Sequence, residues 1–247
     1  MQIRTVEAGR GAGWLLDGFD YFKKDPVNWI VVTILLFVIA IVLRWFPLGL
    51  GEMAFQVIAP AFIAGLVLGC KAQDEGGKIE VRHLFAAFSS ANISQIVLVG
   101  VLYFIGVFNI VIVAASGAFM FGVNLFAMAG ASHAGDILQS GINLGLFLIP
   151  VLIALAASVP LLMAVWFAPA LVVLGNLGAV DALKQSFAGC LANVVPFLVY
   201  GIVGLVLAIV ASIPLGLGWL VLLPMITASL YIAYKEIFTA GAPATVA

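Results

Sequence analysis

The feature that most constrains this chain is a series of six apolar stretches. A helix needs about 20 mainly apolar residues to cross the roughly 30 Å hydrocarbon core of a membrane. Six stretches meet this requirement: 26–46, 53–72, 93–116, 142–174, 193–213 and 217–238. They predict an all-α, polytopic membrane protein with six transmembrane helices.

Composition supports lipid as the solvent. Of the 247 residues, 65% are hydrophobic and 9% are charged, whereas soluble domains have about 45–50% apolar and about 25% charged residues. So few charges cannot cover a surface that faces water. Residues 1–13 lack the apolar core of a signal peptide, so we expect the first span itself to target the chain.

The fourth stretch leaves two interpretations open. It is longer than one span and contains Pro150, Pro160 and Pro169, and proline interrupts the hydrogen-bond ladder of a helix. It is either one long kinked span or a span followed by an interfacial piece. Two full spans would need about 40 residues, so six spans in total are expected.

Basic residues predict the orientation. Nine of the ten Lys and Arg residues fall on the side of the two termini, and only Arg44 falls on the other side. Cytoplasmic loops carry the excess of Lys and Arg in membrane proteins. We therefore expect both termini in the cytoplasm.

The segment "DGFDYFKKDPVNW" (17–29) concentrates charge and aromatic residues before the first span. On a helix over residues 14–24, one face carries the apolar residues Trp14, Leu15, Phe19 and Phe22. The other face carries the charged residues Asp17, Asp20, Lys23 and Lys24, as in helices that lie at the membrane interface. Asp25-Pro26 predicts an N-cap followed by the first residue of the span. The residues predicted to contact the interface or a partner are Trp14, Phe19, Phe22, Lys23, Lys24 and, on a later helix, Phe187.

This arrangement recurs before the third and fifth spans, over residues 81–88 and 183–191, with Asn193 as a predicted cap of the fifth. The segments 60–71 and 224–235 also match, each running from a Pro to a Lys. We predict one integral membrane domain, 1–247, of three units, each an interfacial helix plus a transmembrane hairpin. The units are 13–74, 79–175 and 180–239, followed by the tail 240–247. The alternative is that apolar helices resemble one another by composition alone.

Three segments carry a family resemblance: "WFAPALVVLGNLGAVDALKQSFAGCLANVVPFLVYG" (166–201), "GWLLDGFDYFKKDPVNW" (13–29) and "SLYIAYKEIF" (229–238). They resemble a family of small six-span inner-membrane proteins of proteobacteria and, distantly, the membrane domains fused to some glycerophosphoryl diester phosphodiesterases. The resemblance implies an all-helical protein of the bacterial inner membrane. It supplies no catalytic residues, and the acidic metal-binding clusters of the phosphodiesterase domain are absent from this sequence.

Enzyme signatures are missing from the sequence, including His-Glu-x-x-His, Gly-x-Ser-x-Gly and the Walker loop. Ser132, His133 and Asp136 lie close together in the segment 116–141, but residues so close in sequence rarely reach the geometry of a triad. For these three residues we expect a solvated loop. The apolar stripe before them, which includes Phe119 and Val123, has three interpretations: an interfacial helix, a plug for a cavity between spans, or a docking segment for a partner. The prediction is therefore no enzyme, no cofactor and no metal site, and the net charge of −1 indicates no nucleic-acid partner.

Uncharged polar residues inside the spans support two interpretations. Tyr103, Asn109, Ser158 and Tyr200 either bond neighbouring helices, as such residues commonly do, or line a cavity. We expect a non-catalytic inner-membrane protein that binds lipid, another membrane subunit or a second copy of itself as an accessory or structural component of the cell envelope. The alternative is a transporter or channel for a small apolar or zwitterionic molecule.

Overall fold

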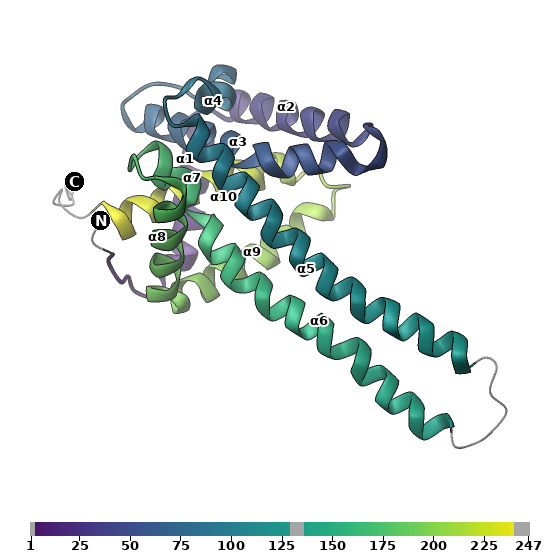
Figure 1. Ribbon diagram of the computed structural model, residues 1–247. Coiled ribbons are helices and arrows are strands. Elements are labelled where there is room, and N and C mark those ends of the chain that lie inside the picture. Colours follow the sequence, from purple (N-terminus) through teal and green to yellow (C-terminus); the bar gives the residue numbers. More distant parts are fainter. Residues whose placement is uncertain (1–2, 129–135, 240–247) are drawn as a thin grey trace. The chain divides into compact units, whose positions relative to one another are not determined.

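The structure, a computed structural model, describes residues 3–128 and 136–239 (Figure 1). All regular elements in these ranges are helices, and six of the helical segments are long and apolar enough to cross a membrane. The predicted all-α membrane fold is therefore confirmed. The helices are α1 (Arg10–Lys24), α2 (Pro26–Arg44), η1 (Pro47–Gly49), α3 (Leu50–Asp74), α4 (Val81–Ala86), η2 (Ala87–Ser89), α5 (Ile93–Met128), α6 (Asp136–Trp166), α7 (Ala168–Val173), α8 (Ala179–Ala192), α9 (Val194–Ser212) and α10 (Trp219–Phe238).

The third span is longer than predicted. Helix α5 continues past residue 116 to Met128 and contains 36 residues, which at 1.5 Å per residue make about 54 Å. A separate interfacial helix was one interpretation of the residues around Phe119 and Val123; in the structure α5 continues through both of them without a break. Ser132, His133 and the side chain of Asp136 lie outside the described part of the chain.

The fourth apolar stretch forms two helices. Helix α6 passes through Pro150 and Pro160 and ends at Trp166, and α7 then begins with Pro169 in its first turn. Proline is tolerated there because the first turn of a helix has no partner for its N–H groups. The side chains of α7 are buried among other helices, so the short piece belongs to the core of the protein.

Two compact units make up the chain. The second unit, residues 102–162, is a hairpin of α5 and α6. Gly106 packs against Leu161, Gly117 against Pro150, and the ring centroids of Phe121 and Phe147 are 5.3 Å apart. These contacts pair later residues of α5 with earlier residues of α6, so the two helices run antiparallel.

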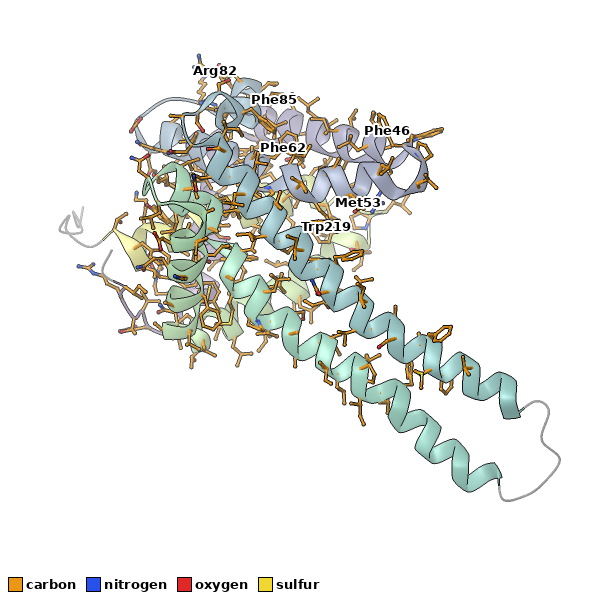
Figure 2. All side chains as sticks on the ribbon, in the orientation of Figure 1. Phe46, Met53, Phe62, Arg82, Phe85 and Trp219 are labelled. Atoms are coloured by element: carbon orange, nitrogen blue, oxygen red, sulfur yellow. The ribbon has the colours of Figure 1, made fainter. Side chains whose placement is uncertain are left out.

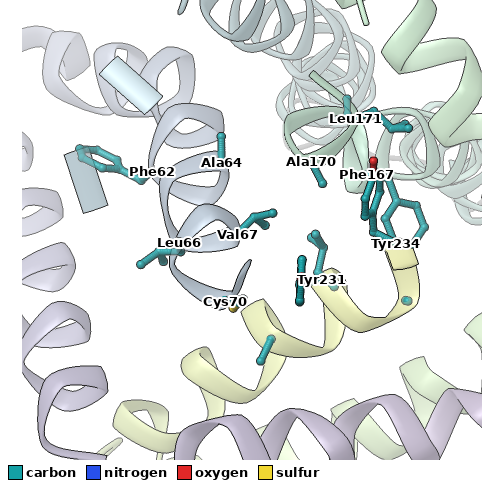
Figure 3. Close-up of a cluster of buried hydrophobic side chains, with 14 of the residues drawn as sticks. Phe62, Ala64, Leu66, Val67, Cys70, Phe167, Ala170, Leu171, Tyr231 and Tyr234 are labelled. Atoms are coloured by element: carbon teal, nitrogen blue, oxygen red, sulfur yellow. The ribbon is translucent and has the colours of Figure 1, made fainter. Parts of the chain in front are cut away.

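The first unit, residues 1–101 and 163–247, holds the main core. Helices α3, α7 and α10 contact one another there, and Figure 3 shows their side chains meeting in one buried cluster. Labelled members of the cluster are Phe62, Ala64, Leu66, Val67, Cys70, Phe167, Ala170, Leu171, Tyr231 and Tyr234. Between helices in lipid the hydrophobic effect is weak, so close packing and hydrogen bonds supply the stability.

The two predicted caps have different outcomes. Asp25 caps α2: its carboxylate accepts hydrogen bonds from the Asn28 backbone N–H at 3.5 Å and from Asn28 Nδ2 at 2.8 Å. Asn193 occupies the cap position of α9, but its side chain makes no capping bond. Its amide instead accepts from the backbone N–H of Val6 and donates to the carbonyl of Arg4, both at 2.9 Å. Asn193 therefore holds the N-terminal segment in place.

Candidate functional site: the short helices and their charged contacts

The apolar face of α1 packs on protein. Trp14 is fully buried and Phe22 nearly so, and two glycines let α1 approach its neighbours closely. A Cβ atom on Gly11 would come within 2.0 Å of the Pro196 carbonyl oxygen of α9, and one on Gly18 within 2.4 Å of the Met225 carbonyl oxygen of α10. Helix α1 is amphipathic as predicted, and helices α9 and α10 cover most of its apolar face.

Arg10 at the start of α1 forms the first charged cluster. Its Nε lies 3.1 Å from Glu236 Oε2 of α10, its second guanidinium nitrogen also contacts Glu236, and that nitrogen lies 2.8 Å from Asp17. Trp14 Nε1 donates to Glu236 Oε2 at 2.8 Å. The hydrogen bond with Glu236 is the largest effect on Arg10 and raises its pKa. The guanidinium therefore stays charged and clamps α1 to α10.

Asp74 at the end of α3 forms the second cluster. The hydroxyl of Tyr21 in α1 donates to one of its oxygens, while the Tyr231 hydroxyl and Lys235 Nζ of α10 lie 3.0 Å and 2.5 Å from the other. Burial, and then the hydrogen bond to Asp74, raise the pKa of Tyr21. Tyr21 therefore remains a protonated donor, and the cluster joins three helices.

Neither cluster was predicted. Arg10 and Glu236 are separated by 226 positions and Tyr21 and Asp74 by 53, and no local pattern connects residues so far apart. The sequence did contain one signal for the second cluster. Asp74 and Lys235 both lie where a predicted span returns to the side of the membrane that holds the termini. Residues on the same side of the membrane can meet.

The outward sides of the three short helices combine charged and apolar residues, and two of the basic ones have acidic neighbours: Lys23 pairs with Asp20 and Arg82 with Glu80. Each of these helices precedes a span: α1 precedes α2, α8 precedes α9, and α4 precedes α5 with η2 between them. Figure 2 shows Arg82 and Phe85 of α4 at the surface. We call these exposed residues the rim: Leu16, Phe19, Lys23 and Lys24 of α1, Val81, Arg82 and Phe85 of α4, and Val180, Lys184 and Leu191 of α8.

The predicted interfacial residues divide between the core and the rim. Trp14 and Phe22 are in the core, whereas Phe19 is 37% exposed and stacks on Phe22 with ring centroids 6.0 Å apart. Lys23 pairs with Asp20 at 2.6 Å, and Lys24 lies 4.3 Å from the centre of the Tyr21 ring. The later candidate, Phe187, is half-buried in α8.

The residues suggested for a cavity have separate local environments. Tyr200 is buried in the first unit, with its hydroxyl 2.8 Å from Ser229 Oγ. Asn109 and Ser158 belong to the second unit, where Asn109 is exposed and Ser158 half-buried, and each donates to a carbonyl of its own helix at 2.7 Å. Tyr103 of α5 is half-buried. The polar groups of Tyr200, Asn109 and Ser158 therefore already have hydrogen-bond partners within the protein.

The part of the chain that the structure describes holds no group of three or more His, Cys, Asp or Glu residues placed to bind a metal. Both cysteines, Cys70 and Cys190, are buried free thiols. Burial raises the pKa of Cys190 to about 12, and a protonated thiol is a poor nucleophile.

In the described part of the chain, six apolar helical segments with exposed apolar side chains define an integral membrane protein. It is 26% identical, over 226 residues, to a probable inner membrane protein of Burkholderia thailandensis; the match covers 87% of this chain and 80% of the relative. The similarity supports a place in the bacterial inner membrane. No protein-family model matches the sequence. No solved structure matches it either.

Proposed function

We propose that the protein is a non-catalytic component of the bacterial inner membrane whose rim binds anionic lipid headgroups at the cytoplasmic surface. The observation that carries the proposal is the composition of the rim. Each of the three short helices presents at least one exposed basic residue beside exposed apolar ones.

The rim has the chemistry of an interfacial lipid site. Exposed apolar side chains such as Leu16, which is 68% exposed, gain by entering the boundary between headgroups and acyl chains. Lys and Arg near an anionic leaflet contribute about 1 kcal/mol each. The positive-inside rule places this rim, together with both termini, on the cytoplasmic side.

The structural roles of the two charged clusters support a non-catalytic protein. Arg10 bonds to Asp17 of its own helix and to Glu236 of α10, and Asp74 bonds to three side chains of α1 and α10. A general acid or base has to exchange protons with a substrate, and these groups are committed to helix contacts. Their removal is therefore expected to affect stability first.

The test is lipid retention by the purified full-length protein. The change is the triple variant Lys23→Gln, Arg82→Gln and Lys184→Gln, which removes one charge from each short helix. Three contacts of about 1 kcal/mol each predict a loss of about tenfold or more in bound phosphatidylglycerol, measured by native mass spectrometry.

Arg44→Gln is the matched control, because Arg44 is exposed at the opposite ends of the spans. It should leave lipid retention unchanged. Equal retention by the triple variant and the wild type would refute lipid binding by the rim. A reproducible protein subunit in place of lipid would assign the rim to a partner instead.

A further inference from the structure

We propose that the first unit is a closed ring of three repeats in which α1, the first helix, completes the last repeat. The centre of the ring is formed by α3, α7 and α10, which contact one another. Around them lie α4, α8 and α1, each docked on one central helix. The repeats follow the three sequence units, and the closing contact joins the two ends of the chain.

The docking contacts follow one rule. Helix α4 packs on α3, where a Cβ on Gly65 would lie 2.3 Å from the His83 carbonyl oxygen. Helix α8 packs at the start of α7, where Ser186 Oγ accepts from the Phe167 backbone N–H at 2.9 Å. In both cases a short helix docks on the returning helix of the preceding unit.

Helix α1 belongs to the first of the three sequence units, and it docks on α10, the returning helix of the last one. Gly18 lies against Met225, and Arg10 pairs with Glu236. The backbone N–H of Arg4 also donates to the Ile237 carbonyl at 3.0 Å. The order of docking is therefore cyclic, as a closed ring requires. Each central helix also carries a buried proline: Pro60 in α3, Pro169 in α7 and Pro224 in α10.

A repeated turn supports common descent of the first and third hairpins. Residues 47–51 and 214–218 have the same sequence, Pro-Leu-Gly-Leu-Gly. In both turns the first Leu and the next Gly have positive φ, with values of 61° and 72° at Leu48 and Gly49 and 52° and 83° at Leu215 and Gly216. Positive φ is uncommon for any residue other than glycine. Similar composition alone does not account for this identical strained turn.

Burial follows this pattern in the first and third sequence units. Their first spans, α2 and α9, have 17% of their most apolar part buried, whereas the segments Pro47–Asp74 and Trp219–Phe238 have 50% buried. The second sequence unit differs, because its returning segment Phe147–Val173 has only 6% of its most apolar part buried, and the burial there is concentrated in α7. The buried centre of the first unit is therefore formed by α3, α7 and α10.

The test cleaves the backbone of the folded full-length protein at one site in the ring. A protease site inserted after Asn176, between α7 and α8, allows the folded protein to be cut after purification. The proposal predicts that the halves stay together in mild detergent, because α1 of one half holds α10 of the other. Gly18→Leu forces α1 away from α10 and should weaken the association of the halves about tenfold or more.

Gly9→Ala is the matched control, because a Cβ at Gly9 meets no atom within 4 Å, and it should behave as the wild type. Arg10→Gln keeps the packing of α1, removes its ion pairs and should have an intermediate effect; it also serves if Gly18→Leu does not fold. Wild-type halves that separate on cutting would overturn the ring. So would halves that remain equally associated in the wild type and in the variants that weaken α1 docking.

Discussion

At the scale of single residues, adjacent side chains of α10 hold different neighbours. Lys235 contacts Asp74 of α3, whereas Glu236 contacts Arg10 and Trp14 of α1. Consecutive residues of a helix point about 100° apart, so one turn of α10 can bond to two helices. These contacts lie at the ends of spans, where water lowers the cost of charge.

Glu236→Gln is expected to destabilise the protein. It removes the negative partner of Arg10, and bonds to charged groups contribute about 1.5–3 kcal/mol; screening at this partly exposed site reduces the expected loss to about 1–2 kcal/mol. The measurement is the thermal unfolding temperature in detergent.

Glu52→Gln is the control, since Glu52 forms an exposed pair with Arg44 at 3.1 Å. A loss of about 0–1 kcal/mol is expected there. If both variants lower the unfolding temperature by the same amount, Arg10–Glu236 has no special role in holding α1.

His83 predicts a pH dependence at the start of α4. Its Nδ1 accepts the backbone N–H of Glu80 at 2.9 Å, which requires the neutral ring. Burial, and then the charge of Arg82, lower its pKa below the ordinary value. The native state thus favours neutral His83. The stability it contributes is present above pH about 6.5 and is lost as pH falls through the native pKa.

The measurement is thermal unfolding at several pH values for the wild type and His83→Gln. Glutamine at this position can make the same capping bond without titrating. The wild type should lose stability relative to His83→Gln below pH about 6.5. A difference that does not change with pH would contradict this role.

At the scale of elements, hydropathy and capping patterns predicted where most helices lie and did not predict what they touch. Helix α2 begins at Pro26 as expected from the Asp25-Pro26 cap. The amphipathic pattern of α1 indicated an apolar face, but lipid and protein are both apolar environments. Gly11 and Gly18 show that the apolar face packs on protein, because they allow close contact with α9 and α10. These helices lie far along the chain, so the contact could not be predicted from the local sequence.

Asn193→Ala should cost more stability than Asp25→Ala, although both residues precede a span. Asn193 is buried and bonds Val6, Arg4 and Gly189. Removing it leaves the buried Gly189 carbonyl and the half-buried Val6 N–H without this partner, at about 2–3 kcal/mol. Loss of the Asp25 cap is expected to cost about 1 kcal/mol. Unfolding temperatures compare the two, and limited proteolysis should cut residues 3–9 faster only in Asn193→Ala. The reverse order of stability would contradict this anchoring role.

At the scale of the whole molecule, the number of spans can be predicted from local sequence. The contacts between the helices cannot. Six spans could be predicted because hydrophobic length is read within about 20 residues. The length of α5 and the burial of α7 were missed, because both depend on neighbours as well as on local composition. The three-unit organisation remains a prediction, and so does the position of both termini in the cytoplasm.

The proposed function requires the three short helices to lie at the cytoplasmic surface of the membrane. The turns between α2 and α3 and between α9 and α10 must then lie on the opposite side. Single cysteines at Leu16, Val81 and Val180 test one side, and single cysteines at Leu48 and Leu215 test the other; the last two side chains are 92% and 98% exposed. The native cysteines are buried. A membrane-impermeant thiol reagent added to spheroplasts should label Leu48→Cys and Leu215→Cys and spare the three rim positions until the membrane is opened. Labelling of any rim position in sealed spheroplasts would contradict the account.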